Sequence, residues 1–168
     1  MNKLVSACLA CMVSGAALAP VTATAGPASN VDQIRALEAR FAGAVKAKDL
    51  DGIMKVYSGD VLVFDVLPPR QYAGAAAYRK DWQATLAGFK GPLKFAISDL
   101  AVSAEGTTGW GHSIQHLSGV DPKGAKVDLT VRVTDVYRKT GGAWRIVHEH
   151  VSVPVDLETS KADLTSKP

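Results

Sequence analysis

The sequence predicts an α+β domain in which three N-terminal helices pack on one face of a strongly curved, mostly antiparallel sheet. The first supporting observation is size, because 168 residues with 47% hydrophobic and 21% charged residues suit one globular domain. The second is order, because the hydrophobic patterns run helix, helix, strand, helix and then four strands. The composition also excludes collagen-like, disordered and coiled-coil proteins.

Residues 1–25 have the features of a secretory signal peptide. Lys3 gives a basic start, residues 4–19 form an uncharged apolar run, and Ala23-Thr24-Ala25 is a small-x-small cleavage site. We expect cleavage after Ala25, because a cut after Ala19 would leave a proline at the first position, which suits a peptidase poorly. The sequence therefore predicts a periplasmic or secreted protein.

A second interpretation of the leader is a lipid anchor at Cys8. Residues 5–8 look like a lipobox, but the apolar residues before the cysteine are fewer than the roughly 7 to 15 that export needs. We therefore expect no stable membrane anchor after cleavage. Cys8 and Cys11 are the two cysteines of the chain, so the exported domain has no disulfide and no thiolate site. A net charge of +3 without a basic run gives no support for nucleic-acid binding.

The exported domain, residues 26–156, is predicted to begin with two helices. Apolar residues recur at three- and four-residue steps over residues 31–48, which is typical of an amphipathic helix. Asp49 is placed to cap a second, shorter helix, and Ser58-Gly59-Asp60 breaks the pattern after it.

A β-branched and aromatic run at residues 61–67, ended by Pro68-Pro69, predicts a buried strand. A helical pattern returns over residues 74–89. Four strands are predicted after it, at residues 93–103, 107–118, 126–139 and 143–153. Residues 157–168 form a polar tail.

The four histidines stand in two pairs, His112 with His116 and His148 with His150. Even spacing on a strand turns both members of a pair to the same face. One hypothesis is a zinc site that a carboxylate such as Asp65 or Glu149 completes. The alternative, which we prefer because no zinc signature is present, is a set of half-buried polar groups, without metal, inside a pocket or on a sheet surface.

Asp65 is the one charge in its predicted strand, so its carboxylate must be paired or must lie in a pocket. It is a candidate general base, or else it pairs with Arg132 or makes a capping contact to a nearby loop. Arg132 lies in the middle of another strand and either anchors an acidic ligand group or faces solvent. Three aromatic residues lie on apolar stripes and belong either to the core or to a ligand platform: Tyr57, Tyr78 and Trp82.

Three segments of the chain resemble one family. Residues 48–53 (KDLDGI), 63–69 (VFDVLPP) and above all 144–154 (WRIVHEHVSVP) are similar to the SnoaL-like, ketosteroid isomerase-like group of the nuclear transport factor 2-like superfamily. The resemblance covers residues 31–156. It implies a cone-shaped fold around a pocket and a homodimer formed through the outer face of the sheet.

The resemblance also implies roles for particular residues. In ketosteroid isomerases a tyrosine and a protonated aspartate bind an oxyanion while another aspartate moves the proton. Alignment places Asp65 at the base position and Phe41 where the tyrosine would stand. The second aspartate falls on Asp135 or on Thr134. The matching final strand would turn His148 and its neighbours into the cone.

These observations lead to three hypotheses of function. The first is an exported protein that binds a small organic ligand, with no cofactor. The second is a lyase or isomerase in which Asp65 takes a proton, a histidine returns it, and Arg132 or His148 stabilises the developing negative charge. The third is a dimeric scaffold with a vestigial pocket. The candidate catalytic residues are Asp65 and His148, and the candidate ligand-binding residues are Tyr57, Trp82, His112, His116, Arg132 and His150.

Overall fold

The computed structural model describes residues 28–166, so the predicted signal peptide lies outside the described residues. In the part of the chain described, no helix is long and apolar enough to cross a membrane.

The three helices lie where the sequence predicts them. Helix α1 (Asn30–Ala47) begins at Ser29, whose side chain accepts from the backbone N–H of Asp32. Helix α2 (Leu50–Met54) follows at once, with the Asp49 carboxylate capping the N–H of Gly52 at 2.9 Å. Helix α3 spans Ala75–Ala87.

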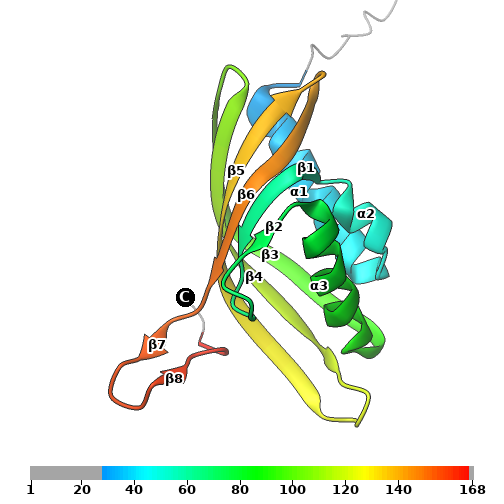
Figure 1. Cartoon of the computed structure of the whole chain (residues 1–168), viewed down its shortest axis with the longest axis vertical. Coiled ribbons are helices and arrows are strands. Elements are labelled where there is room, and N and C mark those ends of the chain that lie inside the picture. Colours follow the sequence, from blue (N-terminus) through cyan, green and yellow to red (C-terminus); the bar gives the residue numbers. More distant parts are fainter. Residues whose placement is uncertain (1–27, 167–168) are drawn as a thin grey trace, which may run out of the picture.

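Six strands form one open, curved sheet in the order β2-β1-β6-β5-β4-β3, and the helices cover one side of it (Figure 1). All neighbours are antiparallel except β1 and β6, which run parallel. The predicted α+β fold is therefore confirmed. The strand bounds are Tyr57–Phe64 (β1), Tyr72–Ala73 (β2), Lys90–Glu105 (β3), Thr108–Val120 (β4), Lys126–Thr140 (β5) and Ala143–Ser152 (β6).

Strand β1 differs from its prediction at both ends. It begins at Tyr57 because this residue pairs with Ile146 of β6, so residues 58–60 lie in the strand and do not break it. The pairing register shifts between Tyr57 and Leu62, which absorbs the irregular segment. The strand ends at Phe64, so Asp65 stands just after the strand rather than inside it.

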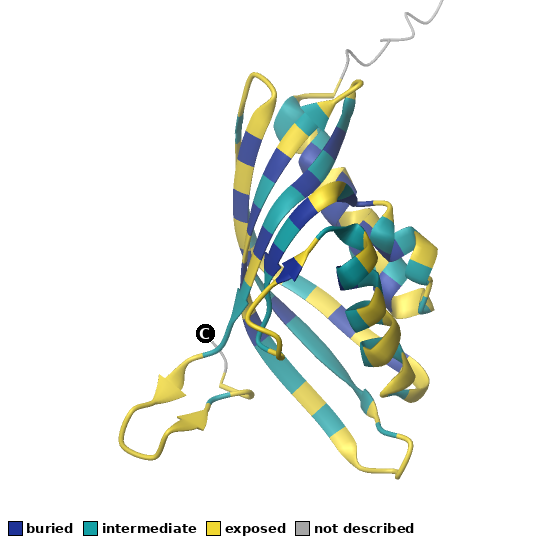
Figure 2. Ribbon diagram, in the orientation of Figure 1, coloured by how far each residue is buried: buried dark blue, intermediate teal, exposed yellow. Residues whose placement is uncertain are grey.

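The core fills the space between the helices and the concave face of the sheet. Figure 2 shows the buried residues in dark blue along the strands and on the helices that face them. Phe41 of α1 is its aromatic centre, with edge-on contacts to Tyr57, Trp82 and Phe95 at ring distances of 5.6 to 6.1 Å.

A β-bulge in strand β6 decides which side chains reach this core. Tyr137 of β5 pairs with Ile146, but the preceding residue Val136 pairs with His148, so Val147 is an extra residue. After Val147, the alternation of side chains between the inner and the outer face of the sheet starts again. Ile146 and Glu149 are therefore both buried on the inner face, although their spacing is odd.

The chain after β6 forms a small hairpin of β7 (Val155–Asp156) and β8 (Lys161–Ala162), which projects away from the sheet (Figure 1). Part of the predicted polar tail is therefore regular. The backbone N–H of Thr130 donates to the Leu164 carbonyl at 2.7 Å and ties the end of the chain to β5.

Candidate functional site

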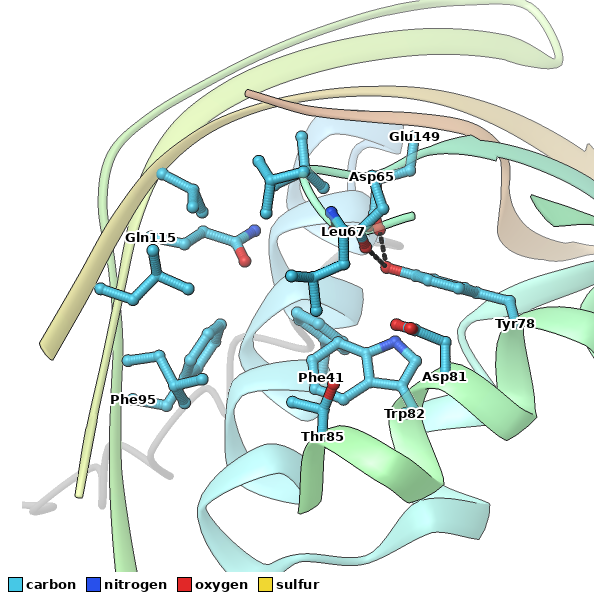
Figure 3. Close-up of a pocket in the computed structure, with 15 residues that line it drawn as sticks. Phe41, Asp65, Leu67, Tyr78, Asp81, Trp82, Thr85, Phe95, Gln115 and Glu149 are labelled. Carbon is cyan, nitrogen blue, oxygen red and sulfur yellow. Dashed lines mark hydrogen bonds between the residues drawn. The ribbon is translucent and has the colours of Figure 1, made fainter. Parts of the chain in front are cut away.

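A cavity opens between helix α3 and the concave face of the sheet (Figure 3). Its walls are mostly apolar, and the polar groups among them include three carboxyls. Such an apolar pocket with a few convergent polar groups is typical of small-molecule sites. The lining residues are Phe41, Asp65, Val66, Leu67, Tyr78, Asp81, Trp82, Thr85, Phe95, Gln115, Leu117, Leu129, Val131, Glu149 and Val151.

Asp65, Tyr78 and Glu149 are joined by hydrogen bonds in this cavity (Figure 3). The Tyr78 hydroxyl lies 2.6 Å from Glu149 Oε1 and 3.2 Å from Asp65 Oδ2. A hydroxyl carries one hydrogen, so it donates to one carboxylate at a time and accepts when the other acid is protonated. Asp65 also accepts from the N–H of Leu67 at 3.2 Å, which fixes the carboxylate after the end of β1.

A second carboxyl, Asp81, lies on α3 at the same cavity. The Tyr72 hydroxyl lies 2.7 Å from Asp81 Oδ1 and 2.9 Å from the carbonyl oxygen of Pro68. Burial is the largest effect on Asp81 and raises its pKa, and the negative charge of Asp65 acts in the same direction. Tyr72 therefore links α3 to the loop that follows Asp65.

Glu149 is the most deeply placed acid of the cavity, with 3% of its surface exposed. Its other oxygen, Oε2, accepts from the Tyr57 hydroxyl at 2.9 Å. Burial raises the pKa of Glu149 to about 7, although the two tyrosine hydrogen bonds favour the ionised form. This carboxyl therefore changes its charge near neutral pH.

The structure brings only part of the predicted site together. Asp65 and Trp82 line the cavity, as expected for a base and a platform. Tyr57 lies behind the cavity wall, where it is 4% exposed and contacts Glu149. Its hydroxyl supports the acid and has no place among the lining residues.

The prediction that the histidines and Arg132 face Asp65 is wrong. His148 and His150 lie on the outer face, because the extra residue Val147 reverses the predicted alternation. The His148 Nδ1 donates to the Leu62 carbonyl at 2.9 Å, and both rings pack against Phe64. The general acid proposed for His148 is thus on the wrong side of the sheet.

The other pair of histidines lies on the same outer face. His112 and His150 flank Thr134 from the two neighbouring strands, and Thr134 is exposed. His116 Nε2 lies 2.8 Å from Asp128 in an exposed pair. Arg132 is exposed as well, so the expected anchor for an acidic ligand does not reach the cavity. Each pair of histidines shares a face as predicted, but the side that the pairs occupy was not predicted, and in β6 the bulge separates His148 and His150 from the face of Ile146.

The register of β5 settles the alternative between Asp135 and Thr134. Asp135 points inward and is 2% exposed, whereas Thr134 points outward. The Asp135 carboxyl lies 3.4 Å from the Tyr137 hydroxyl, and burial raises its pKa well above the usual range.

Sequence reasoning undervalued three residues of the site, namely Tyr78, Asp81 and Glu149. Tyr78 and Trp82 are four residues apart on one helix stripe, a spacing that could have grouped them with a pocket, and Asp81 stands between them. Glu149 was considered only as a metal ligand, because regular alternation turned it away from the cavity. Over residues 28–166, no group of three or more metal-ligating side chains is arranged to hold an ion.

The arrangement is suited to proton transfer on a molecule without negative charge. Among the lining residues of the cavity are three carboxyl groups and no lysine, arginine or histidine. A ligand carboxylate would meet like charges, whereas a carbonyl or hydroxyl group could accept from Tyr78 or a protonated acid.

Comparison with known sequences gives a family match over most of this domain. The sequence model of the SnoaL-like domain matches residues 34–156. A search of curated proteins gives no significant match.

Solved structures share the fold. An NTF2-like (nuclear transport factor 2-like) protein of unknown function from Pseudomonas putida is 33% identical, covers 82% of this chain and 96% of its own, and has a TM-score of 0.74. A candidate scytalone dehydratase from Novosphingobium aromaticivorans is 14% identical over 74% of this chain and 83% of its own, with a TM-score of 0.66. A ketosteroid isomerase-like protein from Erwinia carotovora atroseptica is 13% identical over 73% and 94%, with a TM-score of 0.63.

Proposed function

The chain belongs to the SnoaL-like domain family, and on this premise we propose that it binds a small uncharged organic molecule and transfers a proton on it, as lyases and isomerases do. The observation that carries the proposal is the placement of Asp65. Its carboxylate lies at an apolar cavity, in contact with a tyrosine that a deeper acid also contacts.

The apolar walls supply binding. Phe41, Trp82 and Phe95 are in contact with each other or with the cavity and leave an aromatic surface for a ring or chain of the ligand. The acids orient the ligand through Tyr78, whose hydroxyl they contact. This hydroxyl is the hydrogen-bond donor for a ligand carbonyl.

In the proposed reaction, Asp65 takes a proton from the carbon next to that carbonyl. Tyr78 donates its hydrogen to the oxygen on which negative charge develops. Glu149, whose burial raises its pKa to about 7, in its protonated form then donates to the Tyr78 oxygen at 2.6 Å. Return of the proton from Asp65 to another carbon gives an isomerase, and loss of a neighbouring hydroxyl as water gives a dehydratase.

Binding is tested first, with three probes of one ring size: cyclohexanone, cyclohexanol and cyclohexanecarboxylate. We expect the ketone and the alcohol to raise the Tm of the protein at pH 7 and the carboxylate to leave it unchanged. Leu129→Trp, which fills the cavity, should remove the effect. Asp60→Asn is the control, because this exposed residue of β1 pairs with Arg138 far from the cavity lining.

Two outcomes would contradict the binding proposal. One is the absence of any shift with the neutral probes up to millimolar concentration. The other is an equal shift in Leu129→Trp, which would place the probe outside the cavity.

We also propose that the protein is exported and forms a dimer. Export rests on the features of residues 1–25, and sequencing the N-terminus of the mature protein tests it, with Gly26 as the expected first residue. A dimer through the outer sheet face is supported by the exposure of Trp110, which is 51% exposed there. Light scattering should give twice the protomer mass, and Trp110→Glu should halve it.

A further inference from the structure

Three carboxyl groups are buried together behind the cavity. Glu38 of α1 and Asp135 of β5 are each 2% exposed, and Glu149 of β6 is 3% exposed. Over residues 28–166, the structure contains no ion pair between any of them and a lysine, arginine or histidine. Three buried carboxylates without a cation cannot all be charged at modest cost, so at least one proton stays among them near neutrality.

Tyrosine hydroxyls connect these acids. The Tyr137 hydroxyl lies 2.9 Å from Glu38 Oε1 and 3.4 Å from Asp135 Oδ2. Asp135 stands directly opposite Glu149 on the neighbouring strand, where inward side chains have Cβ atoms roughly 5 Å apart. Asp135 Oδ1 is buried without a hydrogen-bond partner among the described residues, so it is free to share a proton with Glu149.

The series has two different ends. Glu149 reaches the cavity and contacts Tyr78, which in turn contacts Asp65. Glu38 lines a separate groove on the other side of α1, between that helix and β3, together with Arg35, Ala39 and Ala42. The buried acids therefore span the interior from one surface depression to the other.

The pKa values of these acids agree with this geometry. Burial raises the pKa of Glu38 to about 7, against the hydrogen bond from Tyr137, which favours its charged form. Glu149 has a pKa of about 7 as well, and the charges of Asp65 and Glu38 are among the groups that raise it. The charge of Glu38 and that of Glu149 also raise the pKa of Asp135.

We propose that Glu38, Tyr137, Asp135 and Glu149 form one proton-sharing unit, through which Glu38 at the α1 groove sets the protonation of the cavity acid Glu149. Glu38 is then a positioning residue for the reaction, since it acts on the cavity only through the others. The inference rests on the proposed function for its use, because Glu149 supplies the hydrogen that Tyr78 gives to the ligand.

Such a unit would allow Glu38, which lies outside the cavity, to control the protonation of the cavity acid. Ionisation of Glu38 strengthens the hold of Asp135 and Glu149 on the remaining proton, and protonation of Glu38 releases it. A change in the charge of Glu38, whose groove is also lined by Arg35 and Lys46, would thus change the acid strength of Glu149 without touching the cavity.

Carboxyl carbon NMR of the protein labelled at Glu and Asp tests this unit without any ligand. Glu38→Gln keeps the shape and removes the charge. We expect the titration midpoint of Glu149 to fall by about one pH unit, which is a tenfold lower proton affinity. Asp32→Asn is the matched control, since it removes an exposed charge from the first turn of the same helix and should leave the midpoint in place.

A second variant separates the hydrogen-bonded unit from simple repulsion. Tyr137→Phe keeps all three carboxyl groups but removes the hydroxyl between Glu38 and Asp135. In this background we expect Glu38→Gln to shift Glu149 by less than half as much as in the wild type, which a double-mutant cycle measures. Retention of the native fold is checked by near-UV circular dichroism.

The proposal is overturned if Glu149 titrates alike in wild type and Glu38→Gln, or if the shift persists in full without the Tyr137 hydroxyl. Both results are independent of probe binding. A cavity that binds no neutral probe would therefore refute the proposed function and leave this test standing.

Discussion

The inner and outer faces of strands β4, β5 and β6 carry titratable groups in entirely different states. On the inner face of β5 and β6, Asp135 and Glu149 are buried and share their hydrogens with tyrosines. On the outer face, His116 pairs with Asp128 in solvent, where the side chains are 42% and 60% exposed. The comparison teaches that chemistry in this fold follows from the face a residue occupies, and residue type alone is a poor guide.

The largest expected difference between the faces is in proton transfer. Exchange of the protons next to the carbonyl of cyclohexanone, followed by NMR in D2O, measures it without a known substrate. Asp65→Asn should lower the protein-catalysed rate by about 10² to 10⁴, because it removes the base. His148→Gln should change the rate less than twofold, since this ring donates to the Leu62 carbonyl on the other face. Equal losses in the two variants would erase the distinction.

Stability should show the same contrast. Phe41 is 1% exposed, and Phe41→Ala should lower the free energy of unfolding by about 3 to 5 kcal/mol through lost burial and a cavity. Trp110→Ala on the outer face, where half of the side chain is already exposed, should cost about 1 kcal/mol or less in the monomer. Urea unfolding at low protein concentration compares the two, and a similar cost for both would break the comparison.

The pH dependence of stability sharpens the comparison between the two faces further. Glu38 and Glu149 have folded pKa values near 7, against 4.5 for an ordinary glutamate, so the folded protein binds these protons more tightly than the unfolded chain. Their contribution is full below about pH 4.5 and is lost as the pH rises through 7. We expect the free energy of unfolding to fall by roughly 1 to 3 kcal/mol between pH 5 and pH 8 on this account.

The paired variant for this prediction is Glu149→Gln, which stays uncharged at every pH. Its stability should vary less between pH 5 and pH 8 than that of the wild type, in urea titrations at constant ionic strength. A steeper slope in the variant would show that other groups control the pH dependence.

The smallest expected effect belongs to the outer face. Asp128→Asn removes the exposed pair with His116 and should change the free energy of unfolding of the monomer by less than about 0.5 kcal/mol, because water screens exposed charges. Unfolding at low protein concentration, in low and in high salt, measures the effect. A loss above about 1 kcal/mol in the monomer would contradict the prediction.

The sequence was sufficient to predict the fold, because the period of its hydrophobic residues and the positions of its turn residues indicate the same element boundaries at almost every helix and strand. Helix α2 illustrates this agreement, since Asp49 caps it as the sequence indicates. Strand β1 was less predictable, because its first residues are held by pairing with β6, which lies far along the chain. Such non-local pairing leaves no trace in a local pattern.

The candidate site was predictable only at Asp65 and Trp82, whose surroundings follow from local pattern. Glu149 was out of reach because its face depends on the extra residue Val147, and neither Val147 nor its neighbours signal a bulge in the way that a glycine does. Tyr78 was predicted to belong either to the core or to a ligand platform, and it is buried. Its function comes from two carboxylates that the fold brings to its hydroxyl from distant segments.

The extra residue in β6 decides which chemistry faces the inside of this molecule. If Val147 took a regular place in the pairing with β5, the residues after it would all change sides, and imidazoles would enter the hollow as the glutamate left it. Loss of Val147 would instead remove the bulge and keep Glu149 opposite Asp135 on the inner face. A shift of one residue in register thus separates an acid-lined interior from a histidine-lined one on an unchanged scaffold.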